Sequence, residues 1–169
     1  MKRIQQTLRY IRNSNRGQTL IEIIIAVGLI VLVLTTLASG LALGIRNNRV
    51  AKDQAIAKDY TREAQEWLRS MRDLAGWETF AGILRAHASG NSLSYCLTTL
   101  PADLTTFNST NRSTCSTGQT VDGRFTRQVN ITLVGGANPT QADAVVVVTW
   151  VDGTKTFTST STLTLYKWK

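Results

Sequence analysis

The 169 residues provide one domain of roughly 100–150 residues plus an appendage. Hydrophobic residues make up 43% of the chain and charged residues 18%, which excludes a disordered chain and a multi-span membrane protein. Five of the 19 basic residues lie within residues 1–16, which contain no acid, so the net charge of +8 predicts a basic arm and no clear nucleic-acid site. One His and two Cys are too few for the usual zinc frameworks, and we expect no metal and no cofactor.

Residues 23–45 form an uncharged apolar run between Glu22 and Arg46. As a helix, this run would be about 35 Å long, enough to cross roughly 30 Å of hydrocarbon. The basic arm would stay in the cytoplasm by the positive-inside rule, with the chain beyond Arg46 outside. We therefore expect a single-pass membrane precursor that contacts the lipid bilayer.

Two alternatives compete with a membrane span. A secretory signal peptide could be cut near residues 38–40, where Ala-Ser-Gly offers small side chains. Glu22 argues against it, because a carboxylate costs about 2.5–3.5 kcal/mol at bilayer depth and a cleaved signal gains nothing from that cost. A buried core helix is the second alternative, but so small a domain could hardly cover it on all sides.

Residues 16–22, Arg-Gly-Gln-Thr-Leu-Ile-Glu, followed by the apolar run, resemble the N-terminus of type IV pilins and pseudopilins. The resemblance implies that a prepilin peptidase removes residues 1–17 by cutting after Gly17 and methylates the new amine of Gln18. Glu22 then matches the hallmark glutamate at the fifth position of the mature chain. Two departures are Gln18, where Phe or Met is frequent, and the absence of a proline later in the apolar helix.

The spacing of Gln18 and Glu22 has a physical consequence. Residues at i and i+4 lie one above the other on a helix face, so cleavage would place a free amine one turn from the Glu22 carboxylate. In the bilayer this pair can neutralise itself. In a fibre, the carboxylate of an incoming subunit can instead pair with the amine of a neighbour and set the axial register. An interfacial glutamate without a role is the alternative interpretation.

The helical period continues through residues 46–75 and predicts an amphipathic helix of the head. One apolar stripe contains Ala57, Tyr60, Ala64, Trp67, Leu68, Met71 and Leu74, and Gly76 follows as a helix stop. Residues 76–123 show no sustained period and are expected to form a loop. Cys96 and Cys115 bracket much of this loop, and outside the membrane such a pair predicts a disulfide.

Residues 124–169 predict an antiparallel β-sheet. Residues 124–134 alternate, residues 144–151 are a continuous β-branched run, and residues 155–168 alternate again after an Asp152-Gly153 turn signal. The expected fold is α+β and pilin-like: a long N-terminal α-helix, half membrane stem (18–45) and half amphipathic, packed on a small sheet.

We expect a structural protein and not an enzyme, because no catalytic constellation accompanies the single His. The resemblance implies a minor pilin or pseudopilin in a type IV pilus or related filament. Its implied partners are prepilin peptidase, other pilin subunits and an inner-membrane assembly platform. The precursor would lie in the cytoplasmic (inner) membrane and the mature chain in an extracellular or periplasm-spanning filament. The alternative is an anchored or secreted extracytoplasmic binding domain whose motif is coincidental.

Overall fold

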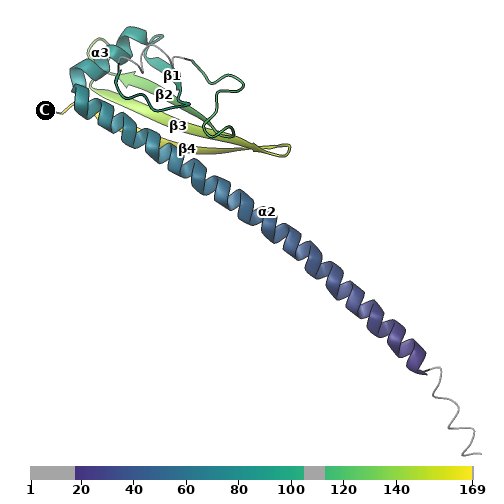
Figure 1. The fold of residues 1–169 in the computed structure, drawn as a ribbon. Coiled ribbons are helices and arrows are strands. Elements are labelled where there is room, and N and C mark those ends of the chain that lie inside the picture. The colour runs from purple at the N-terminus through teal and green to yellow at the C-terminus, as the bar shows by residue number, and fades with distance from the viewer. Residues whose placement is uncertain (1–17, 105–112, 169) are drawn as a thin grey trace, which may run out of the picture. The chain divides into compact units, whose positions relative to one another are not determined.

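The structure is a computed structural model that describes residues 18–104 and 113–168. Two helices come first, α2 (Gln18–Ala75) and α3 (Trp77–His87). Four strands follow: β1 (Ser92–Cys96), β2 (Thr126–Val134), β3 (Gln141–Asp152) and β4 (Lys155–Tyr166) (Figure 1). A long helix followed by a small antiparallel sheet confirms the predicted α+β architecture. Contacts divide the chain after Arg49, and α2 contributes to both units.

The sheet of the second unit is a meander in the order β1-β2-β3-β4, with every neighbouring pair antiparallel. Asp152 pairs with Lys155 across a two-residue turn, and Gly153 adopts the positive φ of 64° that such a turn requires. The predicted hairpin turn therefore forms, but its two central residues are Gly153 and Thr154, one position later than the Asp152-Gly153 signal. The predicted strands also form, although β3 begins three residues earlier than expected and β4 ends at Tyr166.

One face of the sheet packs on the second half of α2. Ala64 and Leu68 of the helix and Val129 and Val146 of the sheet are fully buried in the main core cluster. A smaller cluster contains Ala57, Phe125, Val148 and Trp150. The α2 residues of both clusters come from the predicted stripe, which confirms that this stripe faces the sheet.

Leu74 departs from the predicted stripe, because its side chain is 78% exposed. The chain turns at Gly76, with a positive φ of 73°, and α3 then supplies Trp77 and Phe80 to the core instead. Trp168 also departs from the predicted alternation, since it follows the end of β4 and is 67% exposed. Its ring lies 4.5 Å from the Arg72 guanidinium carbon.

The expectation that residues 76–123 form only a loop is wrong. Helix α3 buries Trp77, Phe80, Ala81 and Leu84, a helical spacing confined to 11 residues. Strand β1 has five residues and pairs with β2 from Ser92 to Cys96. Segments this short carry little intrinsic preference, and packing on the rest of the domain decides their structure.

Candidate functional site

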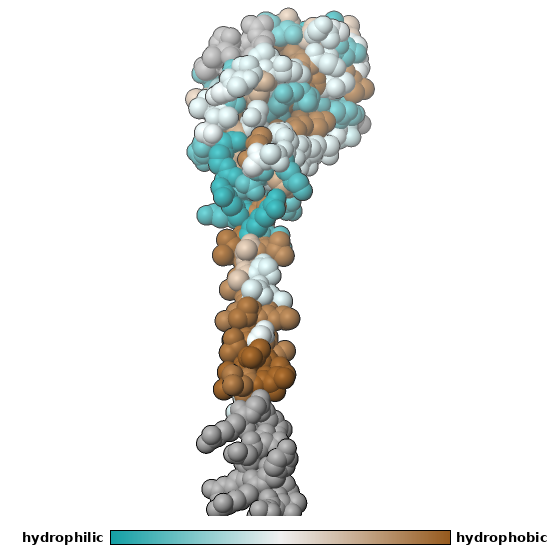
Figure 2. All heavy atoms as spheres, turned by 90° about the vertical axis from the view of Figure 1, so that its right-hand side faces the viewer, coloured by the Kyte–Doolittle hydropathy of each residue, from teal (hydrophilic) through white to brown (hydrophobic). Residues whose placement is uncertain are grey.

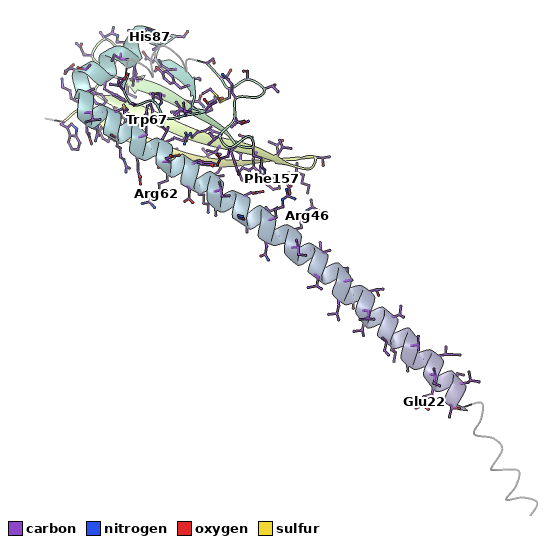
Figure 3. All side chains as sticks on the ribbon, in the orientation of Figure 1. Glu22, Arg46, Arg62, Trp67, His87 and Phe157 are labelled. Atoms are coloured by element: carbon purple, nitrogen blue, oxygen red, sulfur yellow. A yellow bond between two sulfur atoms is a disulfide. The ribbon has the colours of Figure 1, made fainter. Side chains whose placement is uncertain are left out.

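The candidate site begins where the long helix begins. Helix α2 starts at Gln18, and Glu22 follows one turn later, about 6 Å along the axis. The Glu22 side chain is exposed (Figure 3), and the partial positive charge of a helix N-terminus favours a carboxylate there. Gly17 and the rest of segment 1–17 lie outside the described residues, as does the Gln18 side chain. The pairing of amine and carboxylate therefore stays a prediction.

The first half of α2 exposes apolar side chains on all sides. Its large hydrophobic residues from Leu20 to Ile45 are between 52% and 71% exposed. Figure 2 shows them as a mostly brown surface along this segment. Among the described residues, α2 is long and apolar enough to cross a membrane, with a mean hydropathy of 2.8 in its most apolar window and none of that window buried. Exposed apolar surface of this extent requires a bilayer or packed neighbouring helices to cover it.

Three hydroxyl side chains inside this apolar segment are satisfied locally. The Thr35 hydroxyl donates to the Leu32 carbonyl at 2.9 Å, and the Thr36 hydroxyl donates to the Val33 carbonyl at 2.8 Å. Ser39 donates to the Thr36 carbonyl at 2.9 Å. Because these bonds are made within the helix, the hydroxyls need no water. Glu22 thus differs from every other polar side chain of segment 19–45, since it is the one ionisable group there.

Two ion pairs that were not predicted from the sequence join the second half of α2 to β2 and the residues just before it. Asp53 is 3% exposed and accepts two hydrogen bonds from the Arg124 guanidinium, at 3.0 and 2.6 Å. Arg127 is also 3% exposed, and its Nη1 lies 2.6 Å from a Glu63 carboxylate oxygen. Arg127 Nε donates to the Leu97 carbonyl at 3.1 Å. Both arginines lie in the alternating segment that predicted a strand. No local sequence signal identifies the partner of either arginine on the distant helix.

Tyr60 adds a further contact between α2 and the residues that precede β2. Its hydroxyl donates to the Asp122 carboxylate, and its ring lies 5.4 Å from that of Phe125. The hydrogen bond to Asp122, followed by burial and the negative charge of Asp122, raises the pKa of Tyr60 to about 12. Tyr60 and the fully buried Leu68, about two helical turns further on, thus both belong to the packing of the head, as predicted for the stripe.

Cys96 and Cys115 form a disulfide with a Cα–Cα distance of 4.8 Å, as predicted. Cys96 is the last residue of β1, opposite Gln128 of β2. The next residue, Leu97, donates its N–H to the Arg127 carbonyl at 2.8 Å. The disulfide therefore ties the chain that precedes β2 to the end of β1.

Comparison with known proteins finds a match to a family model at the N-terminus of the chain. The model of the prokaryotic N-terminal methylation motif matches residues 12–38. No match was found among curated proteins or solved structures. The matched motif implies processing by prepilin peptidase and assembly with other pilins, and with the apolar helix it fits a membrane-anchored precursor. Residues 12–38 carry the N-terminal signature of type IV pilin precursors.

Proposed function

We propose that this chain is a structural subunit of a type IV pilus or a related pilin-like filament. Prepilin peptidase cuts it after Gly17 and methylates the amine of Gln18. The mature subunit waits in the inner membrane with residues 18–45 in the bilayer. An assembly platform then transfers it into a filament, where the same apolar segment packs against the helices of neighbouring subunits.

The single observation that carries this proposal is the continuity of the matched motif with an exposed apolar helix. The motif covers residues 12–38, and the described chain from Gln18 onward is helical and apolar through the rest of the motif. Removal of residues 1–17 would leave a chain whose first residue, Gln18, already lies in the helix. A repeating contact that does not close on itself generates a filament, and a helix that is apolar on all sides supplies such a contact.

Glu22 has a specific role in this proposal. An unpaired carboxylate within an apolar segment is costly in lipid, and the terminal amine of a neighbouring subunit removes that cost. Because the amine occurs only once per subunit, the pair sets the axial register of each incoming subunit. The exposure of Glu22, one turn after Gln18 in α2, makes its carboxylate accessible to a neighbour.

Within this class we propose a minor pilin or a pseudopilin. Both prolines of the chain lie beyond residue 100, so α2 contains none. The proline that many pilins carry in the apolar helix is therefore missing. The mature subunit would be found in an extracellular or periplasm-spanning filament, and the function of the chain would be mechanical rather than catalytic.

Mass spectrometry of the mature N-terminus tests the proposal. A chain purified from its native membrane or from sheared fibres is expected to begin at methylated Gln18. The alternative, an anchored or secreted binding domain, predicts either an intact N-terminus or a chain that begins near Leu41. Either of these two results would overturn the filament assignment, because an unprocessed or stemless chain cannot assemble through α2.

A further inference from the structure

Strand β4 has one free edge. It pairs only with β3 in the described part of the chain. Because Asp152 and Lys155 close a two-residue turn, the peptide groups of odd-numbered β4 residues face β3 and those of even-numbered residues face away. Two hydrogen bonds agree with this alternation. Gln65 of α2 donates to the outward Thr162 carbonyl at 2.8 Å, and the Lys167 N–H donates to the Thr140 carbonyl at 3.0 Å.

One open part of this edge runs from Thr156 to Thr160. Thr156, Thr158 and Thr160 have exposed side chains, and their outward peptide groups have no hydrogen-bond partner within residues 18–104 and 113–168. The segment is uncharged and contains no proline, and its threonines favour extended backbone. Lys155 lies at one end of it, and the Gln65 contact closes the edge at the other. An edge with these features is a template for another strand.

The opposite edge of the sheet, formed by β1, has a contact at each of its two ends. On β1, Ser92 exchanges both of its backbone hydrogen bonds with Ser89, at 3.1 and 3.4 Å. At the other end of β1, the disulfide holds Cys115 against Cys96. Among the described residues, the short edge strand thus has a contact at each end, whereas the 12-residue edge strand is open from Thr156 to Thr160, next to the hairpin turn. Within the part of the chain that the structure describes, β4 therefore has the longer open edge.

The direction of α2 argues against two-fold pairing of β4 with the β4 of a second copy. Gln65 contacts Ser161 and Thr162, whereas Arg72 contacts Trp168, so α2 and β4 run in the same direction. Two-fold pairing of β4 with another β4 would be antiparallel and would place the two α2 helices in opposite directions. Subunits that enter one membrane through the same helix present that helix in one direction only.

We propose that the β4 edge at Thr156–Thr160 accepts an extended strand from a different protein chain, added antiparallel to β4. The strand would be uncharged where it faces the threonines and would carry an acidic residue opposite Lys155. Backbone hydrogen bonds would supply the affinity, as in other cases of strand addition. The preference for a different chain over a second copy rests on the proposed function, whereas strand addition itself does not.

Amide hydrogen exchange measured by NMR on the full chain in detergent micelles tests this proposal. The probe is the peptide acetyl-Thr-Val-Thr-Val-Thr-Glu-amide, whose Glu lies opposite Lys155 in antiparallel register. Without peptide, the amides of Thr156, Thr158 and Thr160 should exchange fast, whereas those of Phe157 and Ser159 should be protected by β3. Millimolar peptide should slow the three outward amides at least about tenfold. The same peptide with its third residue replaced by Pro should not slow the exchange of these amides.

Two variants at one position separate backbone pairing from side-chain recognition. Thr158→Pro removes an outward N–H that β3 does not use, and it should abolish the slowing while Ser159 stays protected. Thr158→Val keeps the N–H and the shape of the side chain, and it should respond to peptide like the parent chain. Protection of Ser159 in both variants shows that the sheet is intact.

Three results would overturn the proposal. The outward amides could remain fast with peptide, or the slowing could persist in Thr158→Pro. Protection that depends on protein concentration without peptide would identify a second copy as the occupant. None of these results bears on cleavage after Gly17, so a failure here leaves the filament assignment standing. Conversely, an unprocessed N-terminus would not change the exchange rates of the β4 edge.

Discussion

The Arg127 guanidinium, on the buried face of the sheet, lies 2.6 Å from the Glu63 carboxylate of the helix that covers it. The two groups differ in environment, since the side chain of Arg127 is 2% exposed and the side chain of Glu63 is 55% exposed. The same guanidinium donates to the Leu97 carbonyl, directly after the cysteine that ends β1. One side chain therefore connects α2, β2 and the start of the disulfide-closed segment.

Arg127→Met is expected to lower the free energy of unfolding by about 2–3 kcal/mol. It leaves the Leu97 carbonyl without its charged donor and removes the partner of Glu63, although Glu63 remains reachable by water. Chemical denaturation of the full chain in detergent, followed by tryptophan fluorescence, measures the change. Arg62→Met is the matched control, because the exposed Arg62–Glu66 pair contributes at most about 1 kcal/mol. Equal losses in the two variants would contradict a structural role for Arg127.

Tyr60 is expected to make the stability of the head depend on pH in the alkaline range. Its pKa is raised from 10.0 to about 12, chiefly by the hydrogen bond to Asp122. A group with a raised folded-state pKa contributes fully below its unfolded pKa, so this contribution is present below about pH 10 and is lost between about pH 10 and 12. NMR of tyrosine labelled at Cζ follows the titration. Asp122→Asn should lower the Tyr60 pKa and flatten the pH dependence, and an unchanged titration would contradict the assigned cause.

Replacement of both Cys96 and Cys115 by Ser should destabilise the domain by about 3 kcal/mol, as expected for closure of a segment of this length. The sheet and the α2 stripe form cores that include neither sulfur, so the far-UV spectrum should change little. Limited proteolysis should become faster between Leu97 and Val121, which lie between β1 and β2. Faster cleavage within β3 or β4 instead would show that the disulfide supports the whole sheet.

Glu22→Ala is expected to leave processing after Gly17 largely intact and to block entry into filaments, because the proposed pair with the terminal amine of a neighbouring subunit could no longer form. Immunoblots of sheared fibres and of membranes measure the two pools. Thr35→Ala is the control, because it removes a polar group from the same apolar segment. The only described hydrogen bond of the Thr35 hydroxyl is to a carbonyl of its own helix. If Glu22→Ala appears in fibres at the parental level, Glu22 is a passive interfacial residue.

Replacement of Gly17 by Phe should leave the full-length precursor in the membrane. The peptidase must approach the backbone closely at the cut, and a bulky side chain there obstructs it. The size of the membrane-bound chain on a denaturing gel distinguishes the precursor from a product shorter by 17 residues. Normal processing of this variant would remove the main ground for a prepilin peptidase substrate.

The features that could be predicted from the sequence are those specified by a long uninterrupted run or by a clear turn signal. The uncharged run from Ile23 to Ile45 is long enough that no packing context is needed to recognise a helix of membrane length. The Asp-Gly turn between two alternating runs likewise predicted the β3–β4 hairpin, because a positive φ at Gly153 is a local requirement. The short α3 and β1 were missed for the opposite reason: 11 and five residues carry too little periodic signal.

The sequence by itself determined the processing motif, the apolar stem with Glu22 at its start, the buried stripe of α2 and the disulfide partners, because each depends on local spacing or on a single possible pair of cysteines. The tertiary structure alone decided which charges meet. Asp53 finds Arg124 71 residues away, and Glu63 finds Arg127 64 residues away. It also decided where the sheet edges stay open: Ser89 and Cys115 contact the two ends of β1, while the outward groups of Thr156–Thr160 on β4 have no partner among the described residues. Pairing between distant segments depends on how the sheet and helix pack, and no local pattern encodes it.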